Sequence, residues 1–214
     1  MKLLHSSDWH LGCSLRGKRR YEEFASFLDW LIDYLSDADI STFIIAGDIF
    51  DTSTPGNKAQ ELYYDFLYRA AKLCRHIVIV AGNHDSPSFL NAPKQLLKTF
   101  NVYVIAEKAE NIEDQLLILE DEEGNPELIV CAIPYLRDRD IRTAVAGESF
   151  EDKEKKLSEG IKAHYNELFT LAKNKQETLG VDVPIVATGH LFAEGGKTVD
   201  DKLNPSEGDE YAKT

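Results

Sequence analysis

At 214 residues and 43% hydrophobic composition, the chain is long enough to bury one sizeable core, and we expect a single domain. Its net charge of −13, from 37 acidic and 24 basic side chains, argues against binding of nucleic acid by bulk electrostatics alone. Nucleic acid remains open as a substrate, because metal cations at a carboxylate-rich site or a basic partner could supply the attraction for phosphate.

The cysteines and the N-terminal residues indicate a protein of the reducing cytoplasm. Cys13, Cys74 and Cys131 are widely spaced, odd in number and without a Cys-x-x-Cys pair, which supports neither a disulfide framework nor a thiolate zinc site. Residues 1–8 carry little apolar sequence, and no apolar run reaches membrane-spanning length. We therefore expect no signal peptide, no membrane association and a cytoplasmic location.

The first half of the chain alternates short apolar runs with helical patterns. Four runs are predicted to be strands: 2–6, 42–46, 76–80 and 102–105. Helices are expected over the three intervening segments: 21–35, about 58–72 and 86–100. Each strand stops at a polar or glycine-bearing loop, which is the plan of an open α/β sheet with its ligands outside the carboxyl ends of the strands.

From Gln115 the pattern changes. Apolar residues 116–119 and 128–132 flank the acidic turn 121–125, which is typical of a β-hairpin. The remaining elements are predicted in this order: a loop over 133–140, a charged surface helix from about 151 to 175, and a buried strand over 183–187. We therefore expect an α/β fold in which one mixed sheet, or two sheets, lie between helices. The domain is predicted to span residues 1–195, followed by an acidic polar tail over 196–214.

The turn after residues 76–80 is a candidate functional site. It is Ala81-Gly-Asn-His-Asp85, so a buried strand ends in a glycine followed by an amide, an imidazole and a carboxylate. Asn83 offers a neutral oxygen donor, His84 titrates near neutrality, and Asp85 could hold the imidazole in one tautomer. Alone, this motif is equally consistent with a polar turn at a strand end.

Other strand ends carry side chains of the same kinds: Asp8 and His10, Asp48 and Asp51, and His190. Each alone has a plain structural explanation, because an aspartate can cap a helix and a histidine can lie on the surface. Together they indicate a metal site, since metal and catalytic residues gather where strand ends converge. Of the other histidines, His5 is predicted to be a core residue, and His76 and His164 are predicted to be structural or on the surface.

The donor set predicts two divalent cations. Residues two apart in an extended chain point the same way, so Asp8 and His10 can bind one cation. Asp48 offers two oxygens that could bridge the pair, and Asn83 and His190 offer an oxygen and a nitrogen. Oxygen and nitrogen donors without thiolate suit manganese or iron, and zinc remains an alternative.

Such a centre would hydrolyse phosphoesters, because paired cations clamp the attacking and leaving oxygens of a displacement at phosphorus. His84 is expected to point away from the ligand direction of Asn83, and so to contact the scissile phosphate or protonate the leaving oxygen. Either Asp51 or Asp85 could orient its ring, and the sequence does not decide between them.

A basic cluster lies close to the first strand end. It consists of Arg16, Lys18, Arg19 and Arg20. The cluster favours a polyanionic substrate and is a candidate nucleic-acid contact, although a basic loop can equally be a solvated surface.

These motifs resemble the calcineurin-like metallophosphoesterase superfamily. The matching residues are Asp8-x-His10, Gly47-Asp-x-x-Asp51, Gly82-Asn-His-Asp85 and Gly189-His190. Longer strings narrow the resemblance to the SbcD-type nuclease subunits within it: Leu4–Gly12, Ala46–Thr52, Ala81–Ser86, Ile133–Arg137 and Ala187–Leu191. The likeness runs from Met1 to about Leu191 and implies the sandwich fold of that superfamily.

The resemblance also implies a function. Such proteins are manganese-dependent nucleases of DNA repair and recombination that combine double-strand exonuclease with single-strand endonuclease activity, and they work with a coiled-coil ATPase subunit of the SbcC type. By motif, Asp8 and His10 would hold the first metal, Asp48 would bridge, and Asn83 and His190 would hold the second. His84 would act on the leaving group.

A homodimer is implied as well, through helices near 58–72 and 89–100. The aromatic residues Tyr63, Tyr64 and Phe66 could then serve an interface as well as the core.

One departure from the family pattern bears on activity. The family has a Gly-His-x-His motif a few tens of residues beyond Gly189-His190, and this sequence reaches Thr214 without it. We therefore expect a C-terminally truncated chain that binds metal weakly and cleaves DNA poorly. Two alternatives are a phosphodiesterase of the same fold acting on small nucleotides, and a catalytically weak scaffold for dimerisation or docking.

Overall fold

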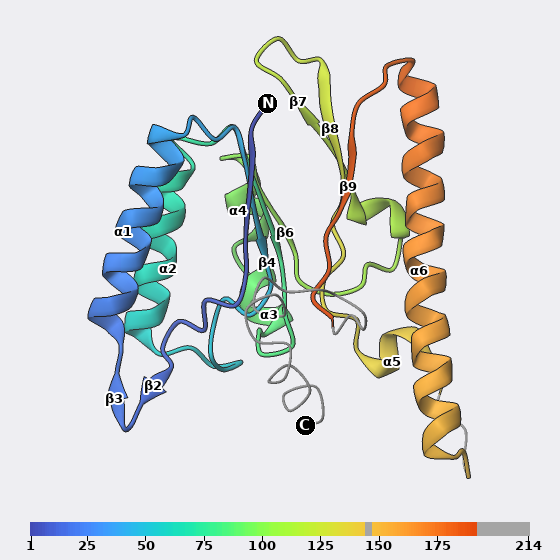
Figure 1. Cartoon of the computed structure of the whole chain (residues 1–214), viewed down its shortest axis with the longest axis horizontal. Helices are drawn as coiled ribbons and strands as arrows, with labels where there is room; N and C mark the ends of the chain where they lie inside the picture. Colours follow the sequence, from blue (N-terminus) through green and yellow to red (C-terminus); the bar gives the residue numbers. More distant parts are fainter. Residues whose placement is uncertain (144–146, 192–214) are drawn as a thin grey trace, which may run out of the picture.

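The computed structural model describes residues 1–143 and 147–191 and shows a four-layered α/β/β/α sandwich (Figure 1). Its elements are β1 (Leu3–Ser6), β2 (Ser14–Leu15), β3 (Lys18–Arg19), α1 (Tyr21–Asp37), β4 (Thr42–Ala46), α2 (Asn57–Ala70), β5 (His76–Val80), α3 (Pro87–Asn91), α4 (Lys94–Lys98), β6 (Val102–Ile105), a 3-10 turn (Ile112–Gln115), β7 (Leu116–Glu120), β8 (Pro126–Cys131), α5 (Asp138–Ile141), α6 (Phe150–Leu179) and β9 (Ile185–Ala187). The predicted α/β fold is confirmed, in its two-sheet form.

The first sheet is fully parallel and has the strand order β1-β4-β5-β6. Residues of β4 and β5 are buried throughout, as expected for a sheet covered on both faces. Ser6 pairs with Ile45, and Ala46 pairs with Val80, so the three strands end at nearly the same level. The loops that follow them therefore meet at one edge of the sheet, at the bottom of Figure 1.

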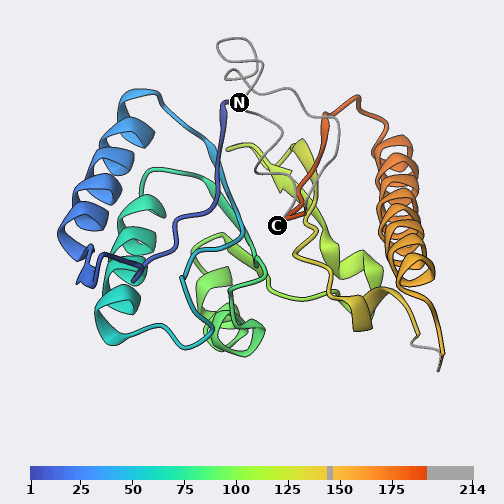
Figure 2. The same cartoon turned by 60° about the horizontal axis from the view of Figure 1, so that its bottom comes forward.

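Helices α1 and α2 lie side by side on the outer face of this sheet (Figures 1 and 2). The core that they share with the sheet includes Phe24 and Leu28 of α1, Phe66 of α2 and Phe43 of β4. Trp9 is buried in the same core and stacks against Phe43 with ring centroids 6.3 Å apart. The loop after β1 is thus anchored by an aromatic side chain between two candidate site residues.

The second sheet, β7-β8-β9, packs against the other face of the first. Between the sheets lie Ile44 and Val78 from the first and Leu128 and Val130 from the second. Its outer face is covered by α6, at the right in Figure 2. Because β9 is parallel to β8, the carboxyl ends of the two strands lie at the same edge of the second sheet.

Several predicted elements differ from the structure. The helix expected over 86–100 is two short helices, α3 and α4, separated at Ala92-Pro93, because proline lacks the N–H that a continuous helix requires. Part of the loop expected over 133–140 belongs to α5. The prediction that His5 is a core residue is wrong, since its side chain is exposed on the edge strand β1.

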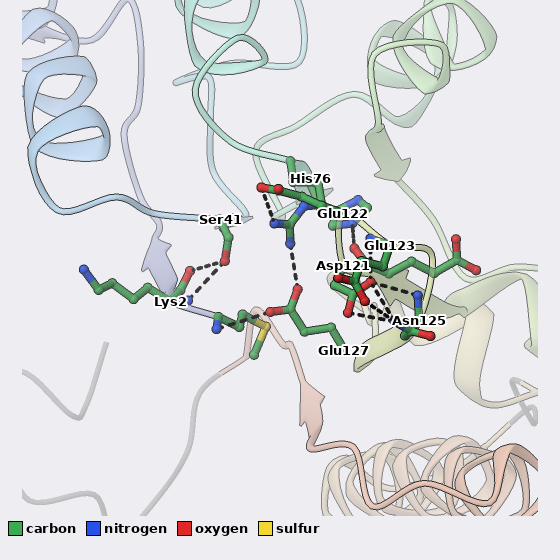
Figure 3. A network of polar contacts seen from close by, with 11 residues as sticks. Lys2, Ser41, His76, Asp121, Glu122, Glu123, Asn125 and Glu127 are labelled. Atoms are coloured by element: carbon green, nitrogen blue, oxygen red, sulfur yellow. Dashed lines mark hydrogen bonds and ion pairs between the residues drawn. The ribbon is translucent and has the colours of Figure 1, made fainter.

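The edge opposite these loops is held by a polar network that ties the β7–β8 turn to the first sheet (Figure 3). Arg75 pairs with Glu127 at 2.8 Å and with Glu122 at 3.1 Å. The ring of His76 bonds the carbonyl oxygen of Glu120 through Nε2 at 2.7 Å. The buried His76 is therefore structural, as predicted.

None of the helices in the described ranges is long and apolar enough to cross a membrane. The predicted tail over 196–214 lies outside the described residues.

The three cysteines are free, which agrees with the absence of a disulfide framework, and they differ in exposure. Burial raises the pKa of Cys74 to about 12 and that of Cys131 to about 11. Cys13 is partly exposed.

A thiol reagent at neutral pH should therefore modify Cys13 first, with Cys74 and Cys131 reacting on the order of 100-fold more slowly until urea unfolds the chain. Mass spectrometry of the labelled protein measures this order, and equal labelling of all three in the folded state would contradict it.

Candidate metal centre

The loops after β1 and β4 continue the parallel pairing of their strands. The backbone N–H of Asp8 donates to the carbonyl oxygen of Gly47 at 3.0 Å, and that of His10 donates to the carbonyl oxygen of Asp48 at 2.9 Å. These hydrogen bonds hold Asp8, His10 and Asp48 in neighbouring positions at the sheet edge.

These residues do not adopt the extended backbone that the sequence suggested. The φ angles of Asp8, His10 and Asp48 are 58°, 48° and 50°, in the left-handed region that non-glycine residues avoid. Each such residue costs on the order of 1–3 kcal/mol and persists only where its surroundings impose it. Trp9, between Asp8 and His10, faces inward and is buried in the core.

The carboxylate of Asp48 lies at the centre of the site and is buried, with 4% exposure. Its Oδ2 lies 3.6 Å from Nε2 of His10 and 3.4 Å from Nε2 of His190. Its Oδ1 accepts a hydrogen bond from the backbone N–H of His84 at 2.9 Å. Asp48 thus contacts groups from the loops after β1, β5 and β9 at once.

Two glycines make this approach possible. A Cβ atom at Gly82 would collide with the backbone nitrogen and the carboxylate of Asp48, and a Cβ at Gly47 would collide with the ring of His190. Gly47 also has a φ of +91°, which other residues rarely adopt. From the sequence, both glycines were recognised only as parts of motifs, and these close contacts were not predicted. Their position directly before polar residues at a strand end is the signal that could have indicated them.

His190 is oriented by the end of β4. Its Nδ1 donates a hydrogen bond to the carbonyl oxygen of Ala46 at 3.0 Å, which directs Nε2 toward the carboxylate of Asp48. Nε2 lies 3.1 Å from Oδ1 of the exposed Asn83. This is the ring orientation that a metal ligand at Nε2 needs.

Within residues 1–143 and 147–191, acidic and imidazole groups form two sets, each with ligand atoms within 4.8 Å of one another. One set is His10, Asp48 and His84, and the other is Asp8, Asp48 and His190. Asp48 belongs to both, as a bridging carboxylate would. Asp8 and His10, which the sequence paired on one cation, fall into different sets.

The ring of His84 is exposed and faces that of His10, with centroids 5.0 Å apart. Its Nδ1 bonds the main-chain carbonyl oxygen of Asp51 at 2.8 Å, and this hydrogen bond raises the pKa of His84. Asp51 therefore orients the ring through its backbone, while its carboxylate lies 3.6 Å from Nδ1 of His10. Nε2 of His84 is left to face solvent or a ligand.

The carboxylate of Asp85 binds backbone N–H groups rather than the ring of His84. The residue is 1% exposed and accepts backbone N–H groups from Ile49 at 3.3 Å, Phe50 at 3.0 Å and Gly82 at 2.9 Å. Burial raises the pKa of Asp85, while these three donors act in the opposite direction. Asp85 fixes the loops after β4 and β5 to each other, and among the described contacts it makes no hydrogen bond to the ring of His84.

The basic cluster forms the β2–β3 hairpin and the start of α1. The side chains of Arg16, Lys18 and Arg19 are exposed, and Arg20 is half-buried over the ring of Phe24. Arg19 also donates to the carbonyl oxygen of Gly12 at 2.6 Å, which ties the hairpin to the loop that carries His10.

Comparisons with known proteins agree with this centre. Residues 1–193 match the family model described as calcineurin-like phosphoesterase. The chain belongs to this family. It is 36% identical over 200 residues to the SbcD subunit of the nuclease SbcCD of Escherichia coli, covering 94% of this chain and 48% of that protein. The corresponding subunits of Rhodobacter capsulatus and Bacillus subtilis are 32% and 29% identical, over 92% and 94% of this chain and 49% of each relative.

The chain thus spans about half the length of these curated relatives. The family membership confirms the superfamily inferred from the motifs.

The contacts of Asp85 predict a loss of stability on Asp85→Asn. Both carboxylate oxygens accept N–H groups, so either orientation of an amide places its own NH₂ against a buried donor. We expect the free energy of unfolding in urea to fall by roughly 2–4 kcal/mol.

The matched control is Asp121→Asn. Asp121 also accepts two backbone N–H groups, from Glu123 at 2.9 Å and Asn125 at 2.8 Å, but its turn is exposed and water can replace them. A loss in the control as large as that of Asp85→Asn would contradict the role assigned to the buried carboxylate.

Proposed function

We propose that the chain is the phosphodiester-hydrolysing part of a metal-dependent DNA nuclease with a two-metal site. The observation that carries this proposal is the position of Asp48, which belongs to both sets of potential ligands. A single carboxylate shared between two imidazole-bearing sets is what a pair of cations a few ångströms apart requires.

The residues present fit divalent cations. All of the donors are oxygen or nitrogen, and the hydrogen bond to Ala46 leaves Nε2 of His190 directed toward the carboxylate of Asp48. Asp8, His10, Asp48, Asn83 and His190 would hold the ions, which we propose to be manganese because hard oxygen donors and imidazole are combined. When bound, the ions would neutralise charge at phosphorus and lower the pKa of a water molecule.

His84 is proposed to act on the substrate. Its ring is held through Nδ1 by the carbonyl of Asp51, and the raised pKa favours the protonated ring. Nε2 can then donate a proton to the leaving oxygen or a hydrogen bond to a non-bridging phosphate oxygen. Because the ring is exposed, an extended polymer can reach it without prior opening of the protein.

DNA is the proposed substrate because a basic hairpin is tied to the loop that carries His10. Arg16 and Lys18 on the β2–β3 hairpin are exposed, and the hairpin follows His10 closely in the chain. The relatives are named as nucleases, which supports the same class of substrate. A role in DNA repair and recombination in the cytoplasm is part of this proposal.

Two partners are proposed on the same grounds. The relatives are named as one of the subunits of the nuclease SbcCD, and we infer an SbcC-type ATPase as the partner of this protein. Homodimerisation through the regions near 58–72 and 89–100 remains a proposal. Tyr63 and Phe66 are buried in the core, so a contact there would use exposed side chains such as Tyr68 of α2 and Leu96 of α4.

The test is hydrolysis of linear duplex DNA and of the small diester bis(p-nitrophenyl) phosphate by the chain with Mn²⁺. Asp48→Asn should lower the rate by at least about 100-fold, because it removes the carboxylate that both sets share. Asp33→Asn on the exposed face of α1 is the control and should leave the rate unchanged.

Activity that persists in EDTA, or in Asp48→Asn, would refute the proposed metal site. Faster hydrolysis of cyclic nucleotides than of linear DNA would favour the small-nucleotide phosphodiesterase instead.

A further inference from the structure

His190 is the one proposed ligand that comes from the second sheet, and its turn is held by Thr188. The backbone N–H of Thr188 donates to the carbonyl oxygen of Cys131 at 3.0 Å. Its buried hydroxyl accepts the backbone N–H of Ile133 at 2.8 Å. These bonds fix the turn to the strand end of β8, but they leave the carbonyl side of Thr188 and the next residue, Gly189, to be held by something else.

The long helix α6 supplies that contact. The hydroxyl of Tyr165, on the side of α6 that faces the second sheet, donates to the carbonyl oxygen of Thr188 at 3.0 Å. A Cβ atom at Gly189 would collide with the same hydroxyl oxygen. The tyrosine therefore fills the space beside the residue that immediately precedes His190.

The protonation of Tyr165 suits this contact. Burial raises the pKa of its hydroxyl to about 12, so it remains a hydrogen-bond donor throughout the neutral range. The ring of His190 bonds the carbonyl oxygen of Ala46 at the end of β4. His190 is thus held at its ring by the first sheet and at the backbone just before it by α6.

We propose that Tyr165 is a positioning residue for His190, so that α6 sets the affinity of the Asp8–Asp48–His190 set for a divalent cation. The inference rests on the proposed metal function. It assigns a role to a helix that contributes no side chain to the centre itself. Partners that orient a metal ligand typically affect affinity by 10–100-fold when removed, and we expect the lower end, about tenfold, because Tyr165 acts through the backbone.

The test is calorimetric titration of the full chain with Mn²⁺, with the number of bound ions checked by electron paramagnetic resonance. Tyr165→Phe should weaken His190-dependent binding about tenfold. In a His190→Ala background, the same substitution should have no further effect, because its route to the metal is gone. Tyr103→Phe removes a partly buried hydroxyl at the opposite edge of the sheets and should bind Mn²⁺ like the wild type.

A second variant tests the contact from the other side. Gly189→Ala should weaken Mn²⁺ binding because its methyl group collides with the hydroxyl of Tyr165. Combining it with Tyr165→Phe removes the colliding atom, so the double variant should bind better than Gly189→Ala alone.

The outcomes separate the two proposals. If the wild type binds no Mn²⁺, the proposed metal function fails. If the wild type binds Mn²⁺ through His190 but Tyr165→Phe binds it equally well, only the role of Tyr165 fails. The same holds if Tyr165→Phe weakens binding by the same factor in the His190→Ala background as in the wild type.

Discussion

The close approach of three loops around the carboxylate of Asp48 is the constraint on which the candidate centre depends. The loops lie so close together that a Cβ atom at Gly47 or Gly82 would collide with a neighbouring loop. Asp85 fixes the loops after β4 and β5 to each other by accepting three backbone N–H groups. With that spacing fixed, the carboxylate reaches imidazoles from both sheets. A methyl group at Gly47 or Gly82 would collide with His190 or Asp48, and one of the groups would have to move.

The two sides of the centre are supported differently. Asp8, His10 and Asp48 are held by a backbone ladder that continues the first sheet, which is a local and repetitive restraint. His190 depends on the packing of one sheet against the other and on α6 beyond it. The geometry of the set that contains His190 therefore depends on how the layers pack. The geometry of the set that contains His84 depends mainly on the loops of the first sheet.

The sequence predicted the strands of the first sheet well, since buried parallel strands are continuous apolar runs with clear ends. It also predicted which side chains gather, because strand ends in a parallel sheet share an edge. It missed how they are arranged. The left-handed backbone at Asp8 and His10 comes from pairing between loops, which periodicity does not encode. Likewise, the sequence left Asp51 and Asp85 as alternatives for orienting the imidazole of His84, whereas the carboxylate of Asp85 binds backbone donors on another loop.

The centre is a costly part of the fold. Three of the proposed ligand residues hold unfavourable backbone angles, and the carboxylates of Asp8 and Asp48 have oxygens within 4.8 Å of each other. Such carboxylates repel one another, and an opposite charge of two units relieves that repulsion as well as serving chemistry. Because an ion that binds only the folded state stabilises it, divalent metal would offset the strain at the place where the fold stores it. The excess of acidic residues in this chain is thus compatible with the proposed nucleic-acid substrate, since bound cations would supply at the phosphate the positive charge that the protein as a whole lacks.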